Sequence, residues 1–319
     1  MIKPRLWITR RLSEATIERA DRDYDLVVNF EDHPGTADQI IAASAEFDAI
    51  IPCHSELFSA NVVAKLNPRL KIVANHSVGV DHCDLDALKS RNIAVTNTPD
   101  VLSDATAEIA MLLMLGAARH AISGDQIVRD GLWTNWSPSF MVGKQLTGAC
   151  LGIIGMGRVG RALAVKARGF EMEIHYHNRT QLDDNDACGA IFHNTIESLL
   201  EVSEFLSLHC PATQQTNKMM NKTRFEMLPK GAVIVNTARG GLIDENALLE
   251  AIISGQISAA GLDCFQVEPG GNPNFAKYKN IFMLPHIGSA TSKTRDAMGF
   301  RALDNLDAFF AGKVPADLL

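Results

Sequence analysis

The sequence predicts an α/β protein made of two lobes, each a doubly wound parallel sheet covered by helices. Strand-like apolar runs alternate with helical patterns along nearly the whole chain, which indicates βαβ units. The length of 319 residues suggests about two domains. A glycine-rich turn between a strand and a helix begins only at Gly155, almost halfway along the chain. A complete series of strands therefore precedes it.

The first hundred residues contain the first series of strands. Strands are expected at residues 6–9, 26–28, 49–52, 70–74 and 94–96, and helices at 13–20, 37–45, 61–66 and 85–90. This spacing is typical of a parallel sheet. The series has no glycine-rich turn that could hold phosphates, so we do not expect a nucleotide site in it.

Two segments join the first series to the second. Residues 103–118 are apolar on nearly all faces, which predicts a helix buried between two domains, with Ser103 and Asp104 as its capping signal. Residues 129–148 form a long connection that contains two tryptophans and a phenylalanine. Long aromatic loops are usually functional or interfacial, and the alternative is a loop packed against its own lobe.

The second series predicts six parallel strands and begins with the glycine-rich turn. The strands are expected at 150–154, 173–177, 205–208, 232–236, 259–263 and 281–284, with helices at 160–168, 196–201, 222–226 and 245–255. This order matches a doubly wound nucleotide-binding domain. A last helix is expected at 290–310 and should cross back onto the first lobe.

The turn Gly155-x-Gly157-x-x-Gly160 has the strand–turn–helix context of a dinucleotide-binding fingerprint. Gly155 permits the tight turn, Gly157 lets the backbone approach a pyrophosphate, and Gly160 lets helix and strand pack closely. The phosphates would lie at the N-terminus of the helix. A turn that is merely rich in glycine is the alternative, and the flanking strand and helix argue against it.

The end of the next strand favours NADP over NAD. An NAD-binding unit usually has an acidic residue about 20 positions past the first glycine. Here that neighbourhood holds Asn178, Arg179 and Thr180. A guanidinium can bind a 2′-phosphate that a carboxylate would repel. Asp183 and Asp184 lie a few residues farther on and keep NAD possible.

Three polar residues follow late strands, at the edge where ligands bind in open α/β sheets. They are Arg239, Glu268 and His286. Beside a nicotinamide they suit reduction of a 2-oxo acid: Arg grips the carboxylate and carbonyl oxygen, His donates the proton, and Glu favours the protonated imidazole. Individually each could be a capping or solvated residue. We expect His209 to line the cofactor groove and not to take part in the chemistry.

Composition excludes several other classes. A net charge of −7 argues against nucleic-acid or anionic-membrane partners. The six cysteines form no CxxC pair, so we read them as reduced residues of a cytoplasmic protein and expect no metal site. The N-terminus lacks the apolar region of a signal peptide, and no apolar stretch is long enough to span a membrane.

Several segments together make the chain resemble the D-isomer-specific 2-hydroxyacid dehydrogenases over essentially its whole length. They are residues 77–84, 98–108, 152–160, 209–211, 235–240, 263–269 and 284–288. The resemblance implies a flavodoxin-like substrate-binding domain (1–99 and 288–319), a Rossmann cofactor domain (100–287), an active-site cleft between them and a homodimer. It also implies that Arg239, Glu268 and His286 are the catalytic residues.

The same resemblance, with the glycine turn, implies the binding residues. Substrate contacts are expected from Ser77, Val78, Gly79, Arg239 and His286, with the carboxylate held partly by backbone amides of Val78 and Gly79. Cofactor contacts are expected from Thr106, Gly155, Met156, Gly157, Arg158, Val159, Gly160, Asn178, Arg179, Thr180, His209, Cys210, Pro211, Thr216, Thr237, Ala238, Asp263, His286 and Gly288.

Within the family the chain most resembles the NADP-preferring glyoxylate/hydroxypyruvate reductases. The expected reaction is NADPH-dependent reduction of small 2-oxo acids to 2-hydroxy acids of D configuration. A reductase for a bulkier acid such as phenylpyruvate and a cofactor-sensing corepressor are the alternatives. Residues 129–142 are expected to wrap around the partner subunit. The candidates to close the partner's substrate pocket are Trp133, Trp136, Phe140 and Met141.

Overall fold

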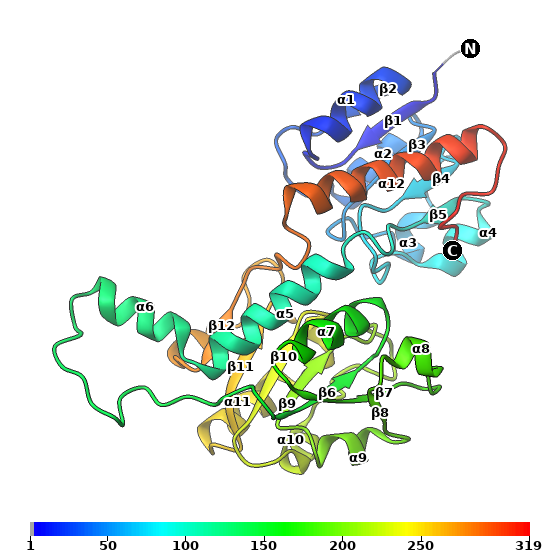
Figure 1. Ribbon diagram of the computed structural model, residues 1–319. Coiled ribbons are helices and arrows are strands. Elements are labelled where there is room, and N and C mark those ends of the chain that lie inside the picture. Colours follow the sequence, from blue (N-terminus) through cyan, green and yellow to red (C-terminus); the bar gives the residue numbers. More distant parts are fainter. Residues whose placement is uncertain (1–2) are drawn as a thin grey trace. The chain divides into compact units, whose positions relative to one another are not determined.

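The computed structural model describes residues 3–319, and the chain divides into two compact units. Unit 1 contains the chain up to Leu102 together with Ser289–Leu319, and unit 2 is the continuous segment Ser103–Gly288. Each unit contains its own parallel sheet (Figure 1). The two-sheet α/β fold predicted from the alternating pattern is confirmed.

Unit 1 has a five-stranded sheet in the order β2-β1-β3-β4-β5, with every pair parallel. The strands are β1 (Arg5–Ile8), β2 (Asp25–Val28), β3 (Ala49–Ile51), β4 (Ile72–Ala74) and β5 (Ala94–Thr96). Alternate residues of a strand face opposite sides of a sheet. Leu6 and Ile8 accordingly join one buried cluster, and Trp7 joins the other.

Helices cover both faces of this sheet. On one face lie α1 (Glu14–Asp23) and α12 (Ser292–Phe310), where Leu303 and Leu306 pack against Leu6 and Ile8. The expected return of the C-terminal helix to the first strands is therefore confirmed. The other face is covered by α2 (Ala37–Ser44), α3 (Ala60–Val63) and α4 (Leu85–Ser90).

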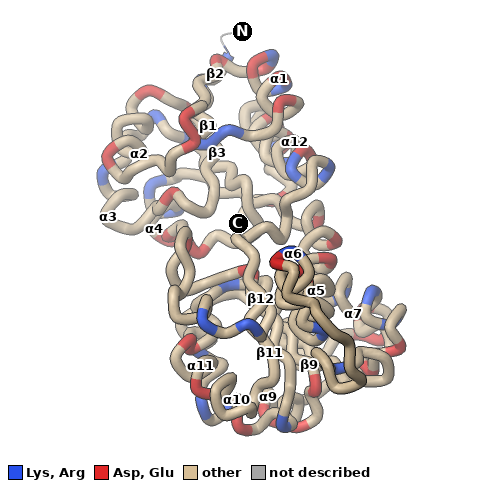
Figure 2. The backbone as a smooth tube through the Cα atoms, turned by 90° about the vertical axis from the view of Figure 1, so that its left-hand side faces the viewer, with Lys and Arg blue, Asp and Glu red and all other residues tan. Residues whose placement is uncertain are grey.

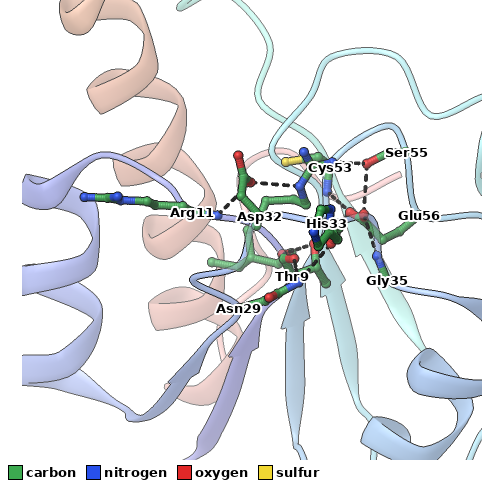
Figure 3. A network of polar contacts seen from close by, with 11 residues as sticks. Thr9, Arg11, Asn29, Asp32, His33, Gly35, Cys53, Ser55 and Glu56 are labelled. Carbon is green, nitrogen blue, oxygen red and sulfur yellow. Dashed lines mark hydrogen bonds and ion pairs between the residues drawn. The ribbon is translucent and has the colours of Figure 1, made fainter. Parts of the chain in front are cut away.

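A buried carboxylate, Glu56, ties together the segments that follow β1 and β3 (Figure 3). One oxygen accepts from the Thr9 hydroxyl and the Cys53 N–H, both at 2.7 Å. The other accepts from the Ser55 hydroxyl at 2.8 Å and from the Gly35 N–H at 3.2 Å. Four donors satisfy this buried charge, so the carboxylate fixes the loop after β3.

Unit 2 has a seven-stranded parallel sheet in the order β12-β11-β10-β9-β6-β7-β8. The strands are β6 (Cys150–Ile154), β7 (Glu173–His177), β8 (Ile191–Phe192), β9 (Phe205–Leu208), β10 (Ala232–Asn236), β11 (Ile257–Leu262) and β12 (Ile281–Met283). The prediction of six strands was wrong by one. β8 is two residues long and pairs only with β7, and so short a strand carries no readable alternation.

The helices of unit 2 pack on both sides of its sheet, except α6 (Ala121–Arg129), which has no buried residue. The others are α5 (Ser103–Ala118), α7 (Arg158–Arg168), α8 (Asp184–Ala187), α9 (Ile196–Leu200), α10 (Lys222–Met227) and α11 (Glu245–Ile253), with 3-10 turns at Gly240–Leu242 and Phe275–Lys277. The predicted burial of α5 is confirmed, since Ala107, Ala110 and Leu113 pack in the core beside β6 and β10. α6 and α8 were not predicted.

The segment after α6 extends away from the rest of unit 2 (Figure 1). Residues 132–145 contain no helix or strand except a turn near Phe140. Trp136 is 72% exposed and Leu132 66%. These exposures contradict the alternative of a loop packed against its own lobe. Positive and negative side chains are interspersed over each unit (Figure 2).

Among residues 3–319, no single helix is long and apolar enough to cross a membrane, although the bent pair α5 and α6 together meets that criterion.

Candidate active site and cofactor-binding residues

The glycine-rich turn has the tight geometry that its sequence predicts. Gly155 has φ of +96°, and a Cβ there would lie 2.5 Å from the Cys210 backbone nitrogen. A Cβ at Gly160 would lie 2.5 Å from the Gly155 carbonyl oxygen. Both positions therefore require glycine, because no side chain fits between the turn and its neighbours.

Gly157 differs, because a Cβ there would meet no atom within 4 Å among the described residues. It caps the N-terminus of α7, and no side chain caps that helix. Backbone N–H groups of a helix's first turn attract anions. The open space beside Gly157 therefore fits the pyrophosphate of a dinucleotide.

Asn178 holds the turn in place from the end of β7. Its Oδ1 accepts a hydrogen bond from the Met156 N–H at 2.7 Å. Sequence reasoning assigned Asn178 to the cofactor and missed this contact, which depends on a backbone donor 22 residues away. The Asn178 side chain thus fixes the backbone of the phosphate-binding turn at Met156.

The neighbouring Arg179 is exposed and makes no hydrogen bond or ion pair with the described residues. Nearby carboxylates are engaged elsewhere. Asp183 accepts from the Asp186 N–H at 2.8 Å and caps α8, and Asp186 pairs with Arg161. The residues at the end of β7 therefore present a guanidinium, Asp183 and Asp186 have structural roles, and Asp184 is exposed.

Several other expected cofactor residues line the carboxyl edge of the sheet. His209 follows β9, accepts or donates a hydrogen bond with Ser207 at 2.8 Å, and has its pKa lowered to about 4 by burial. It is neutral at pH 7 and so is unsuited to donate a proton. Thr237, just after β10, is buried, and its hydroxyl has no hydrogen-bond partner within residues 3–319, which fits a group that would bond to a ligand.

The three expected catalytic residues follow three adjacent strands. Arg239 follows β10, Glu268 follows β11 and His286 follows β12. A Cβ at Gly240 would lie 1.9 Å from the Phe265 carbonyl carbon, so the loop carrying Arg239 presses against the loop carrying Glu268. The topology and this close approach bring the three side chains to one edge of the sheet.

Glu268 and His286 form the central pair. The Glu268 Oε2 lies 2.6 Å from the His286 Nδ1, and the side chains are 22% and 28% exposed. The other Glu268 oxygen accepts from the Phe265 N–H at 2.7 Å. With Nδ1–H donated to a fixed carboxylate, the ring presents Nε2 for proton transfer.

The backbone around this pair is held by two buried residues. Both Asp263 oxygens accept N–H groups, from Ile287 and Gly288, at 2.8 Å, and burial raises the Asp263 pKa. Asn236 donates to the Arg239 carbonyl at 2.8 Å and accepts from the Ala238 N–H at 3.0 Å. Asp263 is predicted to contact the cofactor, and in addition its oxygens engage the loop after His286. Asn236 was not singled out from the sequence.

In unit 1, the loop Ser77–Gly79 follows β4, and among the described residues its backbone carbonyls are hydrogen-bonded whereas its N–H groups are not. The carbonyls of Ser77, Val78 and Gly79 accept from the Thr98 N–H at 2.9 Å, the Asn97 side chain at 2.9 Å and the Ser77 hydroxyl at 2.8 Å. The N–H groups of these three loop residues make no hydrogen bond with the described residues. Successive free N–H groups form an anion-binding concavity.

Comparison with known proteins decides the family. Residues 111–288 match the NAD-binding domain of D-isomer specific 2-hydroxyacid dehydrogenases. The chain belongs to this family. A glycerate dehydrogenase from Hyphomicrobium methylovorum is 40% identical over 98% of both chains. A glyoxylate reductase from Pyrococcus horikoshii is 37% identical over 100% of this chain and 96% of that protein.

Solved structures agree with this assignment. A Polaromonas protein described as a D-isomer specific 2-hydroxyacid dehydrogenase has a TM-score of 0.94 and 43% identity over the whole of both chains. An NADPH-dependent glyoxylate/hydroxypyruvate reductase from Sinorhizobium meliloti, solved with NADP and malonate, has a TM-score of 0.88 and 31% identity over 99% and 97% of the two chains. This 2-hydroxyacid dehydrogenase is therefore an oxidoreductase, and the names of its relatives support 2-oxo acid reduction.

Proposed function

We propose that this 2-hydroxyacid dehydrogenase is an NADPH-dependent reductase of glyoxylate and hydroxypyruvate that forms 2-hydroxy acids of D configuration. The observation that carries the proposal is the 2.6 Å contact between Glu268 and His286 beside the Arg239 loop. A carboxylate–imidazole pair and a guanidinium supply the proton donor and the anion clamp that carbonyl reduction needs.

The reduction adds a hydride and a proton to the substrate carbonyl. NADPH held at the glycine-rich turn would supply the hydride and would be oxidised to NADP⁺. Protonated His286 donates from Nε2 to the carbonyl oxygen as the C–H bond forms at the carbon. The Glu268 carboxylate compensates the ring's positive charge and holds its orientation through Nδ1.

Substrate binding requires donors for the carboxylate of the 2-oxo acid. We assign this role to the N–H groups of Val78 and Gly79 and to Arg239, whose planar guanidinium also stabilises the oxygen that gains charge during hydride transfer. The assignment is supported by the 77–79 loop, whose carbonyls are hydrogen-bonded within unit 1 and whose N–H groups make no hydrogen bond with the described residues.

The preference for NADPH rests on Arg179. Its guanidinium is exposed and unpaired among the described residues, and Asp183 is engaged as a helix cap. A 2′-phosphate offers a bidentate partner for this arginine, and Thr180 lies next to it in the sequence. Binding at this end of β7 leaves the phosphate-binding turn, held by Asn178, free to cradle the pyrophosphate.

We also propose that the protein is a homodimer, through α6 and residues 129–142. This segment exposes Ile122, Val128, Leu132, Trp133 and Trp136. An exposed apolar surface with two tryptophans is typical of an interface. Size-exclusion chromatography with light scattering tests it: the proposal expects a dimer that Trp136→Asp with Leu132→Asp converts to monomer.

Steady-state kinetics with NADPH and NADH test the proposed function. Glyoxylate, hydroxypyruvate and phenylpyruvate serve as acceptors. The proposal expects kcat/KM to favour NADPH by about tenfold or more, and the two small acids over phenylpyruvate. A preference for NADH would overturn the cofactor assignment, and preferential reduction of phenylpyruvate would overturn the assignment of small substrates.

A further inference from the structure

The orientation of the backbone N–H and carbonyl groups in the Ser77–Gly79 loop depends on a side chain that follows a different strand. Asn97 immediately follows β5, the neighbour of β4 in the sheet. Its Nδ2 donates to the Val78 carbonyl at 2.9 Å, in a half-buried setting. We infer that Asn97 is a positioning residue for carboxylate binding, an inference that rests on the proposed function of this loop.

The physical argument concerns the orientation of one peptide plane. The Val78 carbonyl and the Gly79 N–H belong to the same planar peptide unit and point in opposite directions. A donor that holds the carbonyl inward therefore turns the Gly79 N–H outward. Without that donor, the peptide can rotate and present its carbonyl oxygen, which repels a carboxylate.

The remaining contacts of the loop do not replace Asn97. The Thr98 N–H fixes the carbonyl of Ser77, and the Ser77 hydroxyl fixes that of Gly79, at 2.9 and 2.8 Å. These contacts restrain the peptide planes on either side. Among the described residues, only Asn97 restrains the peptide plane between Val78 and Gly79 by a hydrogen bond.

Asn97 is itself anchored by the end of the chain. Its carbonyl accepts from the Asn305 Nδ2 of α12 at 3.3 Å, and the same Nδ2 donates to Asp317 at 2.9 Å. Asp317 in turn receives two hydrogen bonds from Arg301, at 2.8 and 2.7 Å. The C-terminal segment thus supports β5 behind the loop and limits the movement of Asn97.

Loss of the Asn97 donor should weaken carboxylate binding more than it slows the chemical step. If only a fraction of molecules hold the Gly79 N–H outward, the apparent dissociation constant rises by the reciprocal of that fraction. Substrate that does bind selects the competent loop, so kcat at saturation changes less. We expect Asn97→Ala to raise KM for glyoxylate by about fivefold, and Asn97→Asp, which places an acceptor against the Val78 carbonyl, by more.

The experiment compares Asn97→Ala and Asn97→Asp with wild type and with Asn29→Asp. Asn29 is a matched control in the same unit, since its Nδ2 also donates to backbone carbonyls, those of Thr9 and His33. Three quantities are measured on the full chain: KM and kcat for glyoxylate, the affinity for oxalate by calorimetry with cofactor present, and the affinity for NADPH. The inference expects weaker glyoxylate and oxalate binding with unchanged NADPH affinity, in the Asn97 variants alone.

Two outcomes would overturn the inference. One is a variant that melts at lower temperature yet keeps wild-type KM and oxalate affinity, which would make Asn97 merely structural. The other is a wild-type protein that binds no oxalate. If wild type binds oxalate but reduces neither small acid, the proposed function fails, and the oxalate affinities of the Asn97 variants still decide the role of this residue.

Discussion

The His286 imidazole lies 2.6 Å from the Glu268 carboxylate, and His286 reaches this position with a φ of +53°. A left-handed backbone conformation is costly for a residue with a side chain and persists where surrounding contacts impose it. The two N–H groups bound by Asp263, immediately after His286, supply such contacts. The pair is thus held from both the side chain and the backbone.

Replacing His286 by Ala should lower kcat for hydroxypyruvate by about 100-fold or more, because a positioned acid contributes at least that much. The decrease in NADPH absorbance measures the rate, and the affinity for NADPH should change little. His33→Ala, an exposed histidine of unit 1, serves as the control. A near-wild-type rate for the His286 variant would refute the assignment of the acid.

Replacing Arg179 by Ala should reduce kcat/KM with NADPH by about tenfold and leave the value with NADH unchanged, because only NADPH carries the phosphate that the guanidinium would bind. The comparison uses one acceptor with both cofactors. Arg69→Ala, which removes an exposed arginine paired with Asp48, controls for the loss of a positive charge. Equal losses with both cofactors would contradict a role in 2′-phosphate binding.

Replacing Gly157 by Ala should weaken binding of both cofactors by about tenfold without lowering the melting temperature. The new methyl group enters the space that the pyrophosphate would use, and it meets no protein atom within 4 Å. Fluorescence titration and thermal melts measure the two quantities. Gly124→Ala in α6 is the matched control, where a Cβ meets only the Met141 methyl at 3.7 Å. Unchanged cofactor affinity would argue against a phosphate cradle at this turn.

Replacing Glu56 by Gln should cost about 2–3 kcal/mol of unfolding free energy. Each Glu56 oxygen accepts one backbone N–H, from Cys53 or Gly35, so an amide must place its NH₂ group against one of these donors. Ser55→Ala, which removes a single hydroxyl donor, should cost about 1 kcal/mol. Urea denaturation measures both, and equal costs would contradict the account.

Acid should destabilise the protein through His76. Burial lowers the His76 pKa to about 4 from 6.5; the residue is 5% exposed, and neither ring nitrogen has a hydrogen-bond partner among the described residues. Below pH 6.5 the unfolded chain protonates this histidine, whereas the folded protein keeps it neutral down to about pH 4. The free energy of unfolding therefore decreases as the pH is lowered from 6.5 to 4, by up to about 3 kcal/mol. His76→Phe should flatten this part of a stability–pH profile measured with urea. An unaltered profile would assign the acid sensitivity to other groups.

The sequence was most informative where a local pattern determines structure. The apolar runs of β6 and β10 are readable because strands buried on both faces are continuously apolar, and the glycine turn is readable because its spacing reflects backbone sterics. β8 was not predicted because this two-residue strand is defined by its pairing with β7 and not by a local sequence pattern.

The supporting roles at the site could not be read from the sequence. Asn178, Asp263 and Asn97 each bond to backbone groups far along the chain, at Met156, Ile287 and Val78. Such contacts depend on which strand ends lie together, and no local pattern records that. Residue type and position after a strand were enough to mark Arg239, Glu268 and His286, because chemistry restricts which side chains can serve there.

The division of the chain also sets an order of events during synthesis. Unit 2 is one uninterrupted segment, Ser103–Gly288, whereas one face of the unit 1 sheet is covered by α1 and α12 together, and α12 follows unit 2 in the chain. On the ribosome, unit 2 has all its strands before α12 is made. Until that helix emerges, Leu6 and Ile8 lack the contacts with Leu303 and Leu306 on this face. The nascent chain therefore completes its second unit first and carries an unfinished first unit, exposed to chaperones, until α12 has left the ribosome.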